Sequence, residues 1–157
     1  MSEGQSGDQQ IVVQYRDAPA VDETAARNRQ TLLDALDQFM AGNADDFWSI
    51  FDQDVVFHEA ACLPYGGAHK GLAATKRAFA RMSATFESLQ AVFEAVLASR
   101  DIVILYQSIT FRVKENGNTG TLPVAEMYRF RGGKVIEWRA LYFDANMVAQ
   151  AIAGDRA

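Results

Sequence analysis

Apolar residues recur three or four positions apart along the segment that follows Asp22, which places them on one face of an α-helix. The helix is expected to end at Gly42. Asn43 can then cap a second, short helix. The apolar positions of the first helix are Leu32, Leu33, Leu36, Phe39 and Met40, and those of the second are Phe47, Trp48, Ile50 and Phe51.

A strand is predicted over residues 54–60, and a third helix over about residues 72–82. The loop between them, ACLPYGGAHKG, contains one proline and three glycines, so an irregular, bent path is expected there. The glycine pair of this loop does not belong to a phosphate-binding motif, because no GxxxxGK[ST] or GxGxxG pattern is present.

The second half of the chain has the composition of strands. Residues 102–113, 121–130 and 134–143 are rich in β-branched and aromatic residues, and Gly132-Gly133 predicts a tight hairpin between the last two. Residues 89–99 suit a helix about as well as a strand, and a final short helix is expected near Asn146. Helices first and antiparallel strands afterwards predict an α+β domain with helices packed on a curved sheet.

Composition and charge narrow the classes of partner. The chain has 157 residues and a net charge of -5, which gives no attraction for nucleic acid or for anionic membranes. No apolar run approaches the roughly 20 residues that span a bilayer. Residues 1–22 are expected to form a flexible tail, and residues 23–157 a single domain. The single Cys62 and the polar N-terminus favour the reducing cytoplasm.

Two glutamates lie inside strand-like segments. Period-two alternation places Glu59 on the same face as Val55 and Phe57, and Glu126 on the same face as Val124 and Tyr128. If both faces line one cavity, desolvation raises the pKa of at least one carboxyl and creates a candidate acid-base pair. The alternative is that each glutamate faces solvent or pairs with a basic residue such as Arg112, Arg129 or Arg139.

A family resemblance bears on this choice. The motifs DVVFHE, AEMYRF and GGKVIEWRALYFDAN resemble the ketosteroid isomerase branch of the nuclear-transport-factor-2-like superfamily, and the LPYGG and H-K-G loop resembles its SnoaL-like relatives. The similarity covers roughly residues 27–151. It implies a cone-shaped α+β barrel, in which a strongly curved antiparallel sheet wraps a long helix and encloses a deep apolar pocket. It also implies a strand over residues 89–99 and a homodimer.

The resemblance further implies roles for the two glutamates. Glu59 occupies the position of the aspartate that removes a proton, and Glu126 that of a protonated aspartate in the oxyanion hole. Ala35 occupies the position of the oxyanion-hole tyrosine, so one hydrogen-bond donor of the isomerases is absent. Loss of such a donor typically costs about 10²-fold to 10³-fold in rate, which argues against steroid isomerase activity.

Other side chains are weighed as ligand-binding or metal-binding candidates. His58 and His69 lack companions at metal-ligand spacing, so no metal is expected, while His69 could reach the pocket mouth. Cys62 is expected to be a buried, inert thiol. Trp138 and Tyr142 resemble pocket-wall aromatics of the family, although core or dimer packing would explain them equally well. The full set of predicted ligand-binding residues is Phe57, Tyr65, His69, Tyr128, Trp138 and Tyr142.

The sequence therefore predicts a cofactor-independent acid-base enzyme for a small apolar carbonyl metabolite, with Glu59 and Glu126 as its catalytic residues. Isomerisation, cyclisation, dehydration and hydrolysis all remain open as reactions. The alternative is a module of the same fold that binds a small molecule, or mediates assembly, without chemistry.

Overall fold

The computed structural model describes residues 22–154. Along this part of the chain, helices and strands follow in the order α1 Glu23–Met40, α2 Ala44–Ser49, β1 Phe51–Glu59, β2 Gly67–Lys70, α3 Leu72–Thr85, β3 Phe86–Ser99, β4 Ile102–Val113, β5 Thr119–Arg131, β6 Lys134–Tyr142 and α4 Ala145–Ala153. Residues 1–21 of the predicted tail lie outside the described residues. Asp22 is the N-cap of α1, where its carboxylate accepts a hydrogen bond of 2.9 Å from the Thr24 amide.

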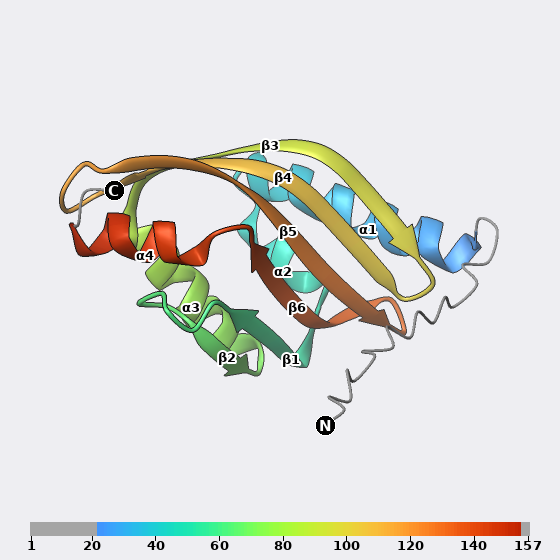
Figure 1. Cartoon of the computed structure of the whole chain (residues 1–157). Coiled ribbons are helices and arrows are strands. Elements are labelled where there is room, and N and C mark those ends of the chain that lie inside the picture. The colour runs from blue at the N-terminus through green and yellow to red at the C-terminus, as the bar shows by residue number, and fades with distance from the viewer. Residues whose placement is uncertain (1–21, 155–157) are drawn as a thin grey trace, which may run out of the picture.

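The six strands form one strongly curved sheet in the order β2-β1-β6-β5-β4-β3 (Figure 1). The sheet does not close on itself, and β2 and β3 are its edges. The predicted α+β architecture, with N-terminal helices against a curved sheet, is confirmed. The expectation of purely antiparallel pairing is wrong at one place, because β1 pairs in parallel with β6.

The helices lie on the concave side and at one end of this sheet. In Figure 1, α1 runs beneath the arch of β3 and β4, while α3 and α4 lie at the opposite end. The buried positions of α1, among them Leu32 and Ala35, face the sheet. Ala41 is the C-cap of this helix, and the next residue, Gly42, adopts a φ of 91°, a conformation that glycine reaches without steric cost; the chain turns there into α2.

Residues 89–99 are part of β3, so the strand that the family resemblance implied is confirmed. Two other predicted elements differ from those observed. Phe51 begins β1 instead of ending α2. The loop predicted over residues 61–71 contains a short edge strand, β2, whose Phe57–His69 pairing joins it to β1. The sequence of this strand, GAHK, lacks the β-branched and aromatic residues that predict a strand. It is identified as a strand by its pairing with β1.

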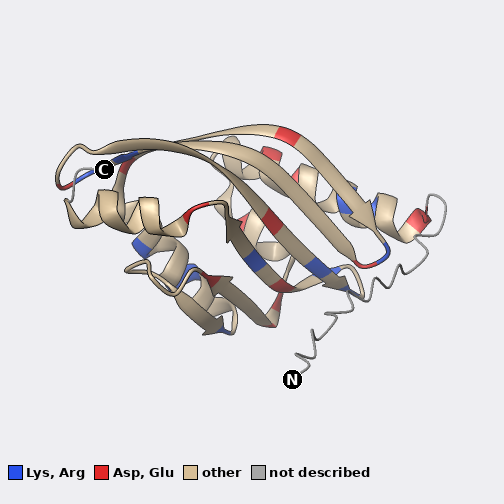
Figure 2. Cartoon of the chain, in the orientation of Figure 1, with Lys and Arg blue, Asp and Glu red and all other residues tan. Residues whose placement is uncertain are grey.

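Charged residues of both signs are interspersed along the strands of the sheet, without a continuous basic stripe in this view (Figure 2). Among the described residues, no helix is both long enough and apolar enough to cross a membrane. The buried residues form two hydrophobic clusters, one around Leu32, Phe57 and Trp138 and the other around Tyr65 and Phe111. Members of both clusters line a cavity.

Candidate active site

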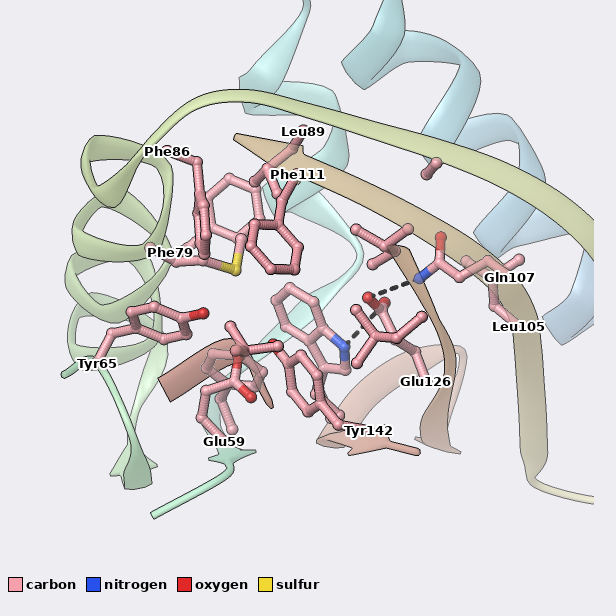
Figure 3. A pocket seen from close by; sticks show the side chains of 18 of the residues that line it. Glu59, Tyr65, Phe79, Phe86, Leu89, Leu105, Gln107, Phe111, Glu126 and Tyr142 are labelled. Atoms are coloured by element: carbon pink, nitrogen blue, oxygen red, sulfur yellow. Dashed lines mark hydrogen bonds between the residues drawn. The ribbon is translucent and has the colours of Figure 1, made fainter. Parts of the chain in front are cut away.

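The cavity lies inside the concave face of the sheet and has a volume of about 190 Å³. Its wall is predominantly apolar and aromatic, with side chains from α1, α2, α3 and α4, from strands β1, β3, β4, β5 and β6, and from the loop after β1 (Figure 3). Polar groups in this wall include the carboxyls of Glu59 and Glu126 and the amide of Gln107. Gln107 is hydrogen-bonded to Glu126, and Glu59 is hydrogen-bonded to the Tyr142 hydroxyl. The site is therefore an apolar, aromatic pocket with a few convergent polar groups, the usual form of a small-molecule site.

Glu59 ends β1 and keeps only 7% of its surface exposed. Its Oε1 accepts a hydrogen bond of 3.1 Å from the Ala60 amide, and its Oε2 accepts one of 3.1 Å from the Tyr142 hydroxyl. Burial outweighs these two donors and raises the pKa of Glu59 from 4.5 to about 7, with a smaller contribution from the charge of Glu126. Near neutral pH this carboxyl is therefore poised to take up or release a proton.

Glu126 lies in the middle of β5 and is surrounded by three hydrogen-bond donors. The Gln107 amide donates to Oε1 at 3.0 Å, and the Trp138 indole donates to Oε2 at 3.2 Å. The Tyr128 hydroxyl also donates to Oε2. Desolvation is the largest influence and raises the pKa of Glu126 in spite of these donors. The protonated form is thus favoured more than in water, while the donors fix the orientation of the carboxyl.

The basic residues that could have neutralised these glutamates are engaged elsewhere. Arg112 pairs with Glu87 at 2.6 Å, and Arg129 pairs with Asp101 at 3.0 Å. Arg139 pairs with Glu137 at 2.6 Å, on the side of β6 that faces away from the cavity. Among the described residues, no lysine, arginine or histidine lines the cavity. The ion-pair interpretation of Glu59 and Glu126 therefore does not hold.

Comparison with known proteins places this site in a family. The model of the SnoaL-like domain matches residues 31–138, which include most of the sheet and both glutamates. The chain belongs to the SnoaL-like family. A search of curated protein sequences found no match.

Solved structures agree with this SnoaL-like fold. A putative SnoaL-like polyketide cyclase from Jannaschia sp. CCS1 is 20% identical, with a TM-score of 0.72, and the match covers 86% of this chain and 97% of that one. Bal32a, from a soil-derived mobile gene cassette, is 24% identical, with a TM-score of 0.72 and coverage of 81% and 97%. TerC, co-crystallized with polyporic acid, is 18% identical, with a TM-score of 0.70 and coverage of 81% and 98%. At these identities the comparison shows the fold alone.

Five of the six predicted ligand-binding residues of the SnoaL-like domain line the cavity, namely Phe57, Tyr65, Tyr128, Trp138 and Tyr142. His69 does not line it, because its ring lies outside the wall, where Nε2 is 2.9 Å from the Tyr65 carbonyl oxygen. Ala35 is buried and contributes no hydrogen-bonding side chain.

Two further expectations concern the histidine and cysteine residues. His58 points away from Glu59, as alternation predicted, and its Nε2 lies 3.5 Å from Glu137. The described residues contain no group of three or more potential metal ligands. Cys62 is exposed, which corrects the expectation of a buried thiol: the loop turns its side chain outward while Leu63 and Tyr65 point inward.

Gln107 is a polar cavity residue that sequence reasoning missed. It lies between Leu105 and Ile109 on the inward face of β4 and is only 3% exposed. A long amide among apolar residues at the same strand period is a signal for a buried polar partner. The partner is Glu126 on the neighbouring strand β5, which lies opposite Leu105 in the register and accepts the Gln107 hydrogen bond.

The raised pKa of Glu59 predicts how stability depends on pH. Its protonated form is favoured in the folded protein, so this contribution is complete below pH 4.5 and is lost as pH rises toward the folded value of about 7. At about 1.4 kcal/mol per pKa unit, the loss approaches about 3 kcal/mol. Urea unfolding from about pH 4 to about pH 8 is expected to show the wild type losing stability relative to Glu59→Gln by that amount. An equal pH dependence of both proteins would contradict the burial of an ionisable Glu59.

Proposed function

We propose that this SnoaL-like domain is a cofactor-independent acid-base enzyme that acts on a small, uncharged carbonyl compound. Glu59 is assigned as the base and Glu126 as the acid. The observation that carries the proposal is the pair of carboxyls in one apolar cavity, both with raised pKa values and neither with a cationic partner in the described part of the chain. Paired titratable groups held in different environments are a common basis for acid and base roles.

In the proposed reaction, the Glu59 carboxylate removes a proton from the carbon next to the substrate carbonyl. The electron pair of the broken C–H bond forms the carbon-carbon double bond of an enolate, and the negative charge moves to the carbonyl oxygen. The protonated Glu126 stabilises that oxygen by a hydrogen bond. Where a second double bond is conjugated with the enolate, the far carbon of that bond takes the proton back from Glu59 and the carbonyl re-forms. Alternatively, the enolate carbon forms a bond to a second carbonyl carbon of the same substrate, the C=O electron pair moves to that oxygen, and the oxygen takes the proton from Glu59. The first outcome is an isomerisation and the second a cyclisation.

The dimensions and chemistry of the cavity support a compact aromatic or polycyclic substrate. A cavity of about 190 Å³ is comparable with the apolar cavity of about 150 Å³ that holds benzene. The Phe57 and Trp138 rings are stacked, with their centroids 4.2 Å apart, and present a flat wall. The related TerC was co-crystallized with polyporic acid, and the Jannaschia protein is described as a putative polyketide cyclase. These descriptions support organic ring compounds as the first substrates to test.

Within residues 22–154, no cationic side chain lines the cavity, which predicts strong discrimination against anionic ligands. The probes 1-naphthamide and 1-naphthoate have nearly the same shape and differ in charge. At about pH 8, where Glu59 is largely ionised, 1-naphthoate is expected to bind at least about tenfold more weakly by isothermal titration calorimetry. The difference is expected to shrink at about pH 5, because Glu59 becomes neutral. Equal affinities at both pH values would contradict the proposed cavity electrostatics.

The catalytic proposal is tested with 1-tetralone, a neutral bicyclic ketone, by following exchange of its α-protons in deuterated water by NMR. Catalysed exchange that disappears in Glu59→Gln supports the enzyme. Binding of 1-tetralone without catalysed exchange would favour the second candidate, a small-molecule-binding module. The complete hydrogen-bonding of the Glu126 carboxyl by Gln107, Trp138 and Tyr128 is the observation that favours this candidate.

The homodimer and the cytoplasmic location remain predictions. The exposed apolar side chains Leu97, Tyr106, Leu141 and Phe143 on the sheet and its C-terminal end support a partner subunit. The single cysteine supports a reducing compartment.

A further inference from the structure

Two tyrosine hydroxyls, those of Tyr142 and Tyr65, lie in sequence beside the Glu59 carboxyl inside the cavity. The Tyr142 hydroxyl donates to Glu59 Oε2 at 3.1 Å, and it lies near enough to the Tyr65 hydroxyl for the two groups to influence each other. Since the single proton of Tyr142 is donated to Glu59, the Tyr142 oxygen is left as an acceptor that the Tyr65 hydroxyl can use. Figure 3 shows the Tyr65 hydroxyl directed from its loop into the cavity, on the side where Tyr142 and Glu59 lie.

The loop after β1 is built in a way that holds Tyr65 in this position. The Leu63 amide donates to the Ala60 carbonyl at 3.1 Å, and the Gly66 amide donates to the Leu63 carbonyl at 2.9 Å. A Cβ atom at Gly66 would lie 2.1 Å from the Ala60 oxygen, so this close turn requires glycine. His69 fixes the other side of the residue by its contact with the Tyr65 carbonyl.

Packing alone does not explain why these two residues are tyrosines. Tyr65 is 2% exposed, and its ring is 6.3 Å from that of Phe86, in apolar surroundings that a phenylalanine would fill equally well. Burying a hydroxyl is unfavourable unless it forms a hydrogen bond. In this cavity the Tyr142 hydroxyl is the group beside the Tyr65 hydroxyl, and Tyr142 is bonded in turn to Glu59.

We propose that Tyr142 and Tyr65 are positioning residues for Glu59, which together hold the carboxylate in place and set its strength as a base. The inference rests on the proposed function, because Glu59 is the base of that reaction. Tyr142 acts directly, and Tyr65 acts through Tyr142 by polarising its hydroxyl. A chain of hydrogen bonds of this kind strengthens each member, since every donor makes the next one a better donor.

The direction of the effect follows from the groups around Glu59. Tyr142 on β6 and the Ala60 amide stabilise the ionised carboxylate and lower its pKa, while burial and Glu126 on β5 raise it. From the loop, Tyr65 and Cys62 complete the set of titratable groups, with Cys62 acting on Tyr65. From α3, Phe79 and Met82 contribute only apolar contacts to the cavity. Removal of either hydroxyl should therefore make Glu59 a stronger base that is protonated at higher pH.

The test is a carboxyl-carbon NMR titration of Glu59 in the wild type, Tyr142→Phe, Tyr65→Phe and Tyr106→Phe. Tyr142→Phe is expected to move the midpoint upward by about one pH unit or more, the equivalent of one hydrogen bond to a charged group. Tyr65→Phe, which removes a hydroxyl that does not touch Glu59, is expected to move it upward by a few tenths of a pH unit. Tyr106→Phe is the matched control, because Tyr106 is 39% exposed and does not line the cavity.

The outcomes separate this inference from the proposed function. A raised wild-type midpoint with an upward shift in both cavity variants, but not in Tyr106→Phe, supports the positioning role of the two tyrosines. A raised wild-type midpoint that Tyr65→Phe leaves unchanged overturns the joint role of the two tyrosines and leaves Glu59 as the base. A wild-type midpoint near the ordinary value of a glutamate overturns the proposed function itself. The midpoint of the pH-rate profile for 1-tetralone exchange should shift in the same direction in each variant.

Discussion

Replacement of Glu59 by glutamine is expected to reduce enzyme-catalysed α-proton exchange of 1-tetralone by about 10²-fold to 10⁴-fold, the usual contribution of a general base. Glutamine has nearly the same shape and can still accept a hydrogen bond from Tyr142, but it cannot take up a proton at neutral pH. The fold should therefore be retained while the chemistry is lost. Exchange is measured by the decay of the α-proton signals in deuterated water, at several enzyme concentrations.

A matched substitution distinguishes this effect from a general change in charge. Glu94→Gln alters an exposed glutamate of β3 that is absent from the cavity wall. It should leave the exchange rate unchanged. A Glu59→Gln protein that exchanges 1-tetralone at the wild-type rate, with Glu94→Gln also unchanged, would remove Glu59 from the mechanism.

Glu126→Ala is expected to destabilise the protein as well as inactivate it. The substitution leaves the donors on Gln107, Tyr128 and Trp138 without their acceptor, and all three residues are less than 5% exposed. A buried donor without a partner costs about 1–3 kcal/mol, so the free energy of unfolding should fall by about 3 kcal/mol or more. Loss of the proposed hydrogen bond to the substrate oxygen should also lower the exchange rate by about 10²-fold to 10³-fold.

Glu126→Gln is the control for this experiment. A glutamine at this position keeps one oxygen as an acceptor for part of the donor set, so it should recover much of the stability that alanine loses. Urea unfolding of the three proteins at one pH measures the difference. If alanine were tolerated as well as glutamine, the three donors would have other partners, and the described hydrogen-bond network around Glu126 would be incorrect.

Much of the fold could be predicted from the sequence where residue type and local period agree. The run from Ile102 to Val113 is rich in β-branched and aromatic residues and forms β4 over the same residues. Alternation correctly placed Glu59 beside Phe57 on the buried face of β1, and His58 on the opposite face. These predictions succeeded because the side-chain direction in a strand is set by the backbone alone.

Other features depend on contacts between distant segments and could not be predicted in this way. In β3, residues 87–94 are all exposed, since this strand is at the edge of the sheet, and its sequence lacks the alternation that burial on one face imposes. The parallel pairing of β1 with β6 brings Phe57 next to Trp138, although 81 positions separate them in the chain. The approach of Tyr65, Tyr142 and Glu59 depends on this pairing and on the folded loop after β1.

The candidate site was predictable in its main residues but not in its hydrogen bonds. Both glutamates and five aromatic residues were expected at the cavity on grounds of alternation or resemblance. The donors to Glu126 come from three different strands, so no local pattern could assign them. The same is true of His69, which faces the Tyr65 carbonyl and not the cavity.

The central claim is that Glu59 is a buried carboxyl that exchanges its proton near neutral pH. A carboxyl-carbon NMR titration of the wild-type protein, with Glu59→Gln to assign the signal, tests it most directly. The structure predicts a midpoint at about pH 7 for Glu59. A midpoint near the ordinary glutamate value of about 4.3 would show a solvated carboxylate and would contradict the acid-base mechanism.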